Sequence, residues 1–233
     1  MKYFYLFSFI SIVVTIFPAC EKETGPDELG GNTRIALTAT DSSSYISGDY
    51  NGQYFSNSSM TVKSNNDGIV TYVAKIDVSQ FSTDIKIKAI NSITQLMDYY
   101  KFDSSGGVFN IVNDVLTFEF KLKVTSEGYL DYFMEGKPWV IGRYADGVGT
   151  KYSIKNSKGE ILTREITEKT GIDEWPIGFW LIKTSKIEQM APADDPVIDK
   201  VIYRINHKFG LVYVEYQLKD GTKLKLNVWA WFI

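Results

Sequence analysis

The sequence predicts a mainly β protein, an antiparallel β-sandwich or barrel-like body of about a dozen strands, and three observations support this fold class. Three segments alternate strictly between apolar and polar residues, as do strands with one buried face and one wet face. Aromatic residues, which pack well on a pleated sheet, make up 15% of the chain. Dipeptides that favour a positive φ separate strand-like runs and predict hairpins. These dipeptides are Asp67-Gly68, Lys158-Gly159 and Asp220-Gly221.

The apolar faces of the three alternating segments consist of Val70, Tyr72, Ala74, Ile76 and Val78; of Leu116, Phe118, Phe120, Leu122 and Val124; and of Leu224, Leu226, Val228, Ala230 and Phe232. The clearest hairpin joins residues 211–219 to residues 222–232. Further strands are expected at 34–40, 53–63, 108–112, 129–134, 140–144, 151–154, 161–166, 178–184 and 200–205.

One stretch breaks the strand pattern. Apolar residues recur at helical spacing over residues 89–100, which predicts one short helix there, whereas Ile85 and Ile87 just before it favour a strand. Residues 103–107 follow as a flexible, apolar-free stretch and form the best internal boundary. The body, residues 33–233, is therefore expected as one unit, with a division into two small β domains at 103–107 as the alternative.

Residues 1–19 have the features of a signal peptide. Lys2 provides a positive charge, an uncharged and largely apolar run covers residues 3–17, and Ala19 precedes Cys20, the single cysteine of the chain. This segment resembles the signal of bacterial lipoproteins, in which the cysteine is diacylated and becomes the mature N-terminus. The resemblance implies a membrane anchor, such as palmitate, on Cys20, because two acyl chains anchor a protein stably. The alternative is an ordinary secretory signal with an incidental cysteine.

The residues after Cys20 are acidic. Glu21, Glu23, Asp27 and Glu28 resemble the export signal that sends lipoproteins of Bacteroidota to the cell surface. The resemblance implies an outer-membrane lipoprotein displayed on the cell surface. Residues 20–32 also contain several glycines, so they are expected to form a flexible, solvated tether whether or not they carry an export signal.

Composition excludes several function classes. The net charge is −3 and the basic residues are scattered, so we expect no nucleic acid partner. A chain with one cysteine and one histidine, His207, has no disulfide framework, no thiolate metal site and no multi-histidine metal centre. We therefore expect no metal and no cofactor. His207 itself is interpreted as an exposed residue of a turn.

Carboxylates are the remaining candidates for catalysis. Two acidic side chains at a suitable separation are enough for glycoside hydrolysis, and several acidic residues fall in predicted loops. No Gly-x-Ser-x-Gly motif accompanies the serines, and no calcium-loop spacing occurs. No catalytic residue is assigned, and a carboxylate-based glycoside hydrolase stays an alternative. The loop carboxylates are Glu135, Asp146, Asp173, Glu174, Asp194 and Asp195.

Aromatic residues in predicted loops give the only candidate ligand site. Trp175 follows Asp173 and Glu174 directly, and Trp139 follows a Gly-Lys-Pro turn. A tryptophan beside acidic groups on an exposed rim suits a flat sugar ring, so these four residues form a candidate site for a glycan or a small ligand. Trp175 is expected to be exposed, whereas Trp180 is expected to be a core residue of the strand 178–184.

The last strand carries apolar residues on both faces, because Trp229 and Trp231 lie opposite Leu226 and Val228. It is therefore expected to be central or covered. Together these features predict a non-enzymatic, lipid-anchored binding or accessory protein of the bacterial envelope, facing the surface or the periplasm. Its partners would be the membrane, through Cys20, and a glycan, a small ligand or an envelope protein. A structural subunit of an envelope complex is a further alternative.

Overall fold

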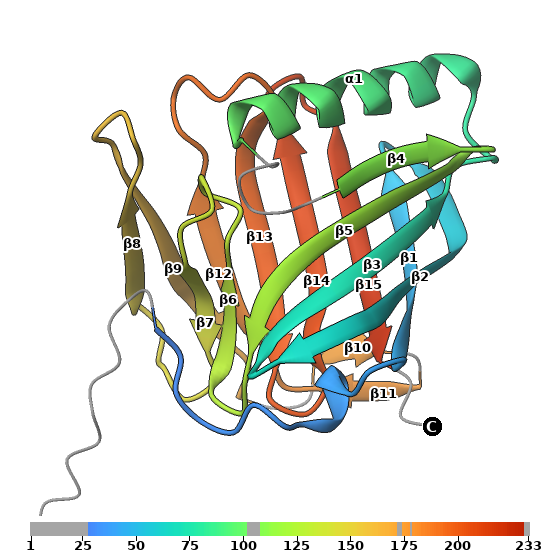
Figure 1. Ribbon diagram of the computed structural model, residues 1–233. Helices are drawn as coiled ribbons and strands as arrows, with labels where there is room; N and C mark the ends of the chain where they lie inside the picture. The colour runs from blue at the N-terminus through green and yellow to red at the C-terminus, as the bar shows by residue number, and fades with distance from the viewer. Residues whose placement is uncertain (1–27, 102–107, 172–173, 178, 231–233) are drawn as a thin grey trace, which may run out of the picture.

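A computed structural model describes residues 28–101, 108–171, 174–177 and 179–230 of the chain. Among these residues, 13 strands form one antiparallel sheet that curls into a nearly closed barrel, and one helix lies across its end (Figure 1). The mainly β fold class is thereby confirmed. The signal peptide, Cys20, the acidic residues up to Asp27 and the stretch 103–107 lie outside the described residues.

The sheet runs in the order β7-β6-β5-β3-β2-β1-β15-β14-β13-β12-β9-β8, and β4 pairs with β5. Strands from both sides of 103–107 share it, since β3 pairs with β5 and β1 pairs with β15. The strands are β1 (Ser43–Tyr50), β2 (Gln53–Asn66), β3 (Ile69–Asp77), β4 (Val108–Val112), β5 (Val115–Val124), β6 (Gly128–Asp131), β7 (Trp139–Arg143), β8 (Lys151–Lys155), β9 (Ile161–Lys169), β12 (Ser185–Met190), β13 (Ile198–Asn206), β14 (Gly210–Leu218) and β15 (Lys223–Ala230).

Side chains close the barrel between its two edge strands, β7 and β8. The indole Nε1 of Trp139 on β7 donates a hydrogen bond to the backbone oxygen of Tyr152 on β8, at 3.1 Å. The Tyr152 hydroxyl in turn accepts from the backbone N–H of Arg143 at 3.1 Å and donates to Asp146 at 2.6 Å. Trp139 and Tyr152 are both only 1% exposed. These buried contacts, which we call the seam, satisfy polar groups that an open sheet edge would leave unpaired.

Close packing across the barrel depends on a glycine of β7. A Cβ atom at Gly142 would lie 3.0 Å from Cδ1 of Ile205 and 3.2 Å from Cδ1 of Ile187, which belong to β13 and β12. The missing side chain therefore lets β7 approach the opposite wall. This half of the barrel is filled by side chains.

Helix α1 (Thr83–Tyr99) covers the other half of the barrel (Figure 1). It is longer than the predicted helix 89–100, and the expectation of a strand at Ile85 and Ile87 is wrong. Ile85 occupies the same helix face as Ala89, four residues later, and packs against the core, whereas Ile87 is 53% exposed. The apolar period of the helix thus already begins at Ile85.

Three further details differ from the sequence prediction. Residues 34–40 form no strand; they contain a single 3₁₀ turn, η1 (Ala36–Thr38), which the Thr38 hydroxyl stabilises by donating to the Ile35 carbonyl at 2.9 Å. Strand β1 was not expected, because serine and glycine interrupt its apolar pattern. Strand β12 was not expected either, because it alternates buried residues with charged ones over only six residues. The predicted hairpin 211–232 is confirmed as β14 and β15.

A short hairpin packs on the outside of the sheet. β10 (Trp175–Ile177) and β11 (Trp180–Ile182) pair with each other and lie near the end of the barrel opposite α1 (Figure 1). Ile177 and Ile182 form a second, small core with Phe209 and Val212, and Trp229 packs against it. The prediction for the last strand is confirmed, because β15 lies between β14 and β1 and its outer face is partly covered.

Candidate functional site

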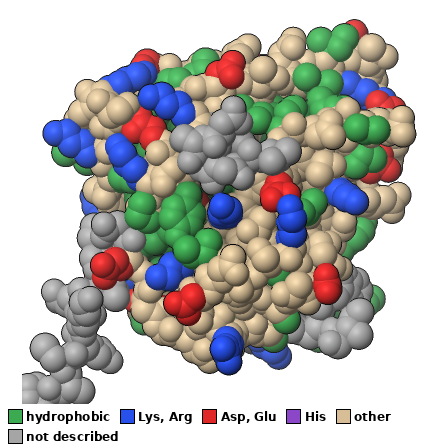
Figure 2. All heavy atoms as spheres, viewed as in Figure 1, with side chains coloured by type: hydrophobic (Ala, Val, Ile, Leu, Met, Phe, Trp, Pro, Cys, Tyr) green, Lys and Arg blue, Asp and Glu red, His purple; other side chains and the backbone are tan. Residues whose placement is uncertain are grey.

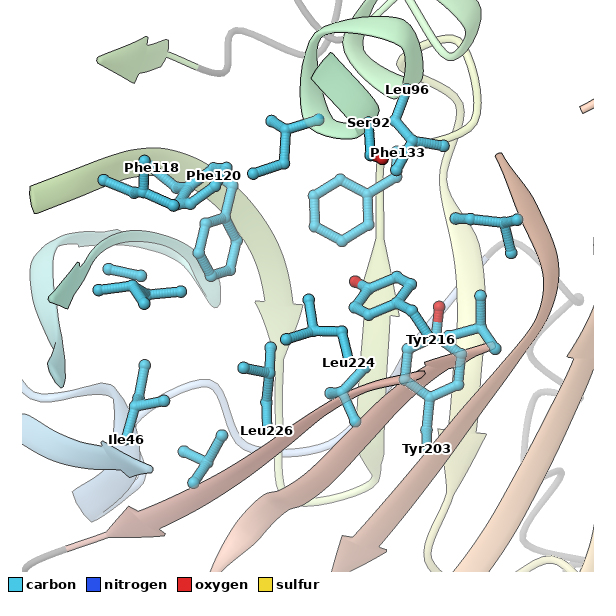
Figure 3. Close-up of a pocket in the computed structure, with 18 of the residues that line it drawn as sticks. Ile46, Ser92, Leu96, Phe118, Phe120, Phe133, Tyr203, Tyr216, Leu224 and Leu226 are labelled. Carbon is cyan, nitrogen blue, oxygen red and sulfur yellow. The ribbon is translucent and has the colours of Figure 1, made fainter. Parts of the chain in front are cut away.

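The barrel contains a cavity of about 330 Å³ beneath α1. Its walls come from strands on both sides of the barrel and from the inner face of the helix (Figure 3). Apart from four tyrosine hydroxyls and the indole nitrogen of Trp139, the only polar side chains among the described lining residues are Ser92, Arg164 and Gln189. The cavity is therefore almost wholly apolar.

The alternating strands of the sequence form much of this lining. Their apolar faces point into the barrel as predicted, and several of their residues lie directly against the cavity (Figure 3). These residues are Ala74, Ile76 and Val78 of the first segment, Leu116, Phe118, Phe120 and Leu122 of the second, and Leu224, Leu226 and Val228 of the third. The apolar side chains on the inside of the sheet thus leave part of the barrel interior unfilled.

Helix α1 completes the cavity with one face. Ala89, Ile93, Leu96, Met97 and Tyr100 recur at helical spacing and all line the space. None of the helix residues is fully buried, and the apolar face of α1 packs partly against the hydrophobic core and partly against the cavity.

Polar contacts with loops hold both ends of this helix. Near its start, Lys86 pairs with Asp114 at 2.9 Å and Lys88 pairs with Asp220 at 2.5 Å. Lys88 and the Thr222 groups that bond Asp220 lower the pKa of that carboxyl to about 2.

At its end, the hydroxyls of Tyr99 and Tyr100 donate to Asp194 at 2.5 Å and to Asp195 at 2.6 Å. Burial and the bond to Asp195 raise the pKa of Tyr100 well above its usual value. Polar contacts thus hold both ends of the helix at the rim of the barrel, and its face toward the cavity is apolar.

A buried ion pair lies at the seam side of the cavity. Arg164 of β9 is 2% exposed and its Nη2 donates to Asp131 of β6 at 2.7 Å. Its Nε donates to Gln189 Oε1 at 2.8 Å and its Nη1 donates to the Trp139 carbonyl at 3.0 Å, while its guanidinium lies 3.7 Å from the centre of the Trp139 ring. Burial raises the pKa of Asp131, and Arg164 offsets part of that rise. The pair joins β9 and β6, the strands next to the two edge strands of the curled sheet.

The four predicted ligand residues do not gather at one place. Trp139 is 1% exposed, belongs to the seam and lines the cavity. Trp175 lies on the outer hairpin and is half-buried, contrary to the expected exposure, because its ring packs 5.1 Å from Tyr213 and 4.3 Å from the Arg204 guanidinium. Glu174 is exposed beside it, and Asp173 lies outside the described residues.

The expectation that Trp180 is a core residue is wrong. Of the predicted strand 178–184, β11 covers only Trp180–Ile182, and Trp180 lies on the outer hairpin with 63% of its surface exposed. One face of its ring stacks on Phe209, with the ring centres 5.8 Å apart. Phe179 and Leu181 beside it are also exposed, so the hairpin carries a small apolar surface.

The loop carboxylates make structural contacts. Glu135 binds Lys137 and Ser157, and Asp195 is 1% exposed and accepts from the backbone N–H groups of Val197 and Ile198. Desolvation by burial raises the pKa of Glu135. The hydrogen bonds from Ser157 and Lys137 outweigh it and lower the pKa to about 2. Asp146 and Asp194 accept from Tyr152 and Tyr99. None of the described loop carboxylates lines the cavity.

The described part of the chain was also compared with the expectations for His207, for metal ligands and for surface charge. His207 is exposed in the turn between β13 and β14. Within the described ranges, no group of three or more His, Cys, Asp or Glu side chains is arranged to hold a metal ion. Lys, Arg, Asp and Glu are interspersed over the face shown in Figure 2. Among the described residues, no helix has both the length and the apolar content needed to cross a membrane.

Sequence reasoning missed the polar residues of the cavity. Arg164 alternates with Leu162 and Ile166, which are buried, so it occupies an inward position of β9. Tyr216 likewise alternates with Val214 and Leu218 on β14. A charged residue on an otherwise apolar strand face was the available signal.

Over the described residues, fold and site together define a class of protein: a nearly closed, antiparallel, barrel-like sheet with one helix over its end and an apolar cavity beneath that helix. Compared with protein families, curated proteins and solved structures, the chain matches none.

Proposed function

We propose that the protein is a binding protein that holds a small apolar ligand in the cavity of its barrel. We also propose that lipid on Cys20 anchors it to the outer membrane, with the body at the cell surface. The observation that supports the binding function is the apolar cavity of about 330 Å³ under α1.

The size of the cavity argues for an occupant. Protein interiors are close-packed, and at about 24 cal/mol per Å³ an empty cavity of this volume costs about 8 kcal/mol. Domains have a net stability of about 5–15 kcal/mol, so the cost is comparable to the whole. An apolar ligand that fills the space removes much of this cost.

The volume also sets the size of the ligand. A cavity of about 150 Å³ holds benzene, so one of about twice that volume holds roughly a dozen non-hydrogen atoms. If each atom contributes about 0.7 kcal/mol, the dissociation constant is micromolar. Medium alkyl chains and small ring compounds fall in this range, whereas a hydrophilic glycan does not match the lining.

The test is a titration with 1-aminonaphthalene, a dye that is uncharged at neutral pH, fits the estimated ligand size and shifts its fluorescence emission in apolar surroundings. The Cys20→Ser protein removes the predicted lipid site and allows purification without detergent. We expect saturable binding of one dye per chain at micromolar concentration. Ala89→Trp, which fills the cavity from α1, abolishes the signal, whereas Ile87→Trp, on the exposed face of the same helix, keeps it.

Absence of saturable binding, or equal loss in both variants, would contradict the proposal. The glycan hypothesis has one supporting observation, the exposed ring of Trp180 on the outer hairpin. A saturable tryptophan-fluorescence response to a soluble glycan, lost in Trp180→Ala and kept in Ala89→Trp, would favour that function instead.

A further inference from the structure

The cavity has one polar end, formed by Arg164, Gln189, Tyr203 and Tyr216, which all line it. Arg164 donates to Gln189 Oε1, and the Tyr203 hydroxyl lies 3.5 Å from the same oxygen. Figure 3 shows the side chains of Tyr203 and Tyr216 pointing into the space, opposite Ser92 and Phe133. A ligand in the cavity therefore meets four polar side chains at this end, whereas Tyr50, Ser92 and Tyr100 line other parts of an otherwise apolar space.

The charges at this end are already balanced. Arg164 is the only charged side chain among the described lining residues, and Asp131 compensates it at 2.7 Å from behind. A carboxylate or phosphate on the ligand would add an uncompensated negative charge, and an ammonium group would be repelled by Arg164. Either charge is strongly disfavoured in surroundings of low polarity.

The hydroxyl of Tyr216 is available to a ligand. It makes no hydrogen bond to any other residue of the described ranges, whereas the hydroxyl of Tyr100 is bonded to Asp195. Burial, the largest cause, and Asp131 raise the pKa of Tyr216 to about 12, although Arg164 opposes them. The hydroxyl therefore keeps its proton at neutral pH and offers both a donor and an acceptor.

We propose that the ligand is an uncharged amphiphile, with an alkyl body in the apolar part of the cavity and one hydroxyl or carbonyl group bound by Tyr216. This inference rests on the proposed function and narrows the ligand class. Fatty alcohols and fatty esters belong to this class, and ionised fatty acids do not.

A second tyrosine provides the matched control. Tyr50 also lines the cavity, is 4% exposed, and its hydroxyl has no partner among the described residues. Its charged neighbours are Lys88 and Asp220 at the rim, whereas those of Tyr216 are Asp131 and Arg164. The two hydroxyls thus mark different ends of one cavity.

The first experiment measures displacement of 1-aminonaphthalene from the Cys20→Ser protein by 1-decanol, methyl decanoate and decanoic acid between pH 6 and 8. We expect the affinity of the alcohol and that of the ester to stay constant over this pH range. The acid binds only after it takes up a proton, so its apparent affinity falls about tenfold per pH unit. The flat ester curve controls for titration of the protein. Decanoate that binds as tightly as the ester at pH 8 would overturn the inference.

The second experiment places the polar group. Tyr216→Phe lowers the affinity for 1-decanol about fivefold, the effect of one hydrogen bond, and Tyr50→Phe does not. Binding of the dye itself reports that the cavity of each variant is intact. Loss of affinity in Tyr50→Phe alone would overturn the placement at Tyr216. Failure of the dye and of every alkyl compound to bind would instead contradict the proposed function.

Discussion

Replacing Arg164 by Met removes the positive partner of the buried pair. Asp131 is 0% exposed and would be left without its guanidinium, and the hydrogen bonds to Gln189 and to the Trp139 carbonyl would also be lost. Removing one partner of a buried pair costs about 3–5 kcal/mol. At this chain length that loss lowers the melting temperature by about 10 °C. The barrel loses its link between β9 and β6 at the same time.

The pH dependence identifies the cause. Burial already raises the pKa of Asp131, and Arg164 lowers it in part, so the variant raises it further. A carboxyl whose pKa is higher in the folded than in the unfolded chain destabilises the fold as pH rises through the interval between the two values. The destabilisation is therefore largest at neutral pH and shrinks as pH falls below the raised pKa. Asp131→Asn in the Arg164→Met background removes this dependence.

The assay is urea unfolding followed by circular dichroism, between pH 5 and 8. The control is Lys151→Met, whose pair with Glu165 is exposed on both sides, at 59% and 41%. We expect about 1 kcal/mol for the control, as for other partly exposed pairs. If Arg164→Met costs no more than the control, or costs the same at pH 5 as at pH 8, the buried pair does not stabilise the fold in this way.

Two further predictions concern packing and motion. Gly142→Val introduces a side chain that meets Ile205 and Ile187, so we expect a loss of about 1–3 kcal/mol in the same urea assay, and a neutral effect would show that β7 does not approach the opposite wall as described. Helix α1 has no fully buried residue, so its amides should exchange hydrogen faster than those of β14 and slow down when 1-decanol binds. Exchange in α1 that is as slow as in β14, or unchanged by ligand, would contradict this.

The sequence predicts the strands more accurately than the site, for a physical reason. Alternation is a local pattern, so the inward faces of β3, β5 and β15 were identified correctly. Closure of the barrel depends on contacts between distant residues, such as the bond from Trp139 to Tyr152 and the pair of Arg164 with Asp131, and no local pattern encodes them. The prediction for Trp180 was wrong because the burial of this residue depends on where the outer hairpin packs.

The cavity itself could not be predicted, because it is a property of curvature. The same apolar faces would form a solid core in a flatter sandwich, and only the curled sheet with α1 over its end leaves a space between them. Of the described residues that line the cavity, only Trp139 was predicted from the sequence to bind a ligand. It was predicted to do so on an exposed rim, whereas it is 1% exposed.

Ligand binding in the cavity can be seen directly in a crystal structure of the Cys20→Ser protein soaked with 10-bromo-1-decanol, from the anomalous signal of bromine. We predict one bromine peak inside the barrel among the apolar side chains near Ile46 and Leu226, with the hydroxyl of the ligand bonded to Tyr216. A bromine peak only on the outer hairpin of Trp180, or no peak at saturating concentration, would contradict ligand binding in the cavity.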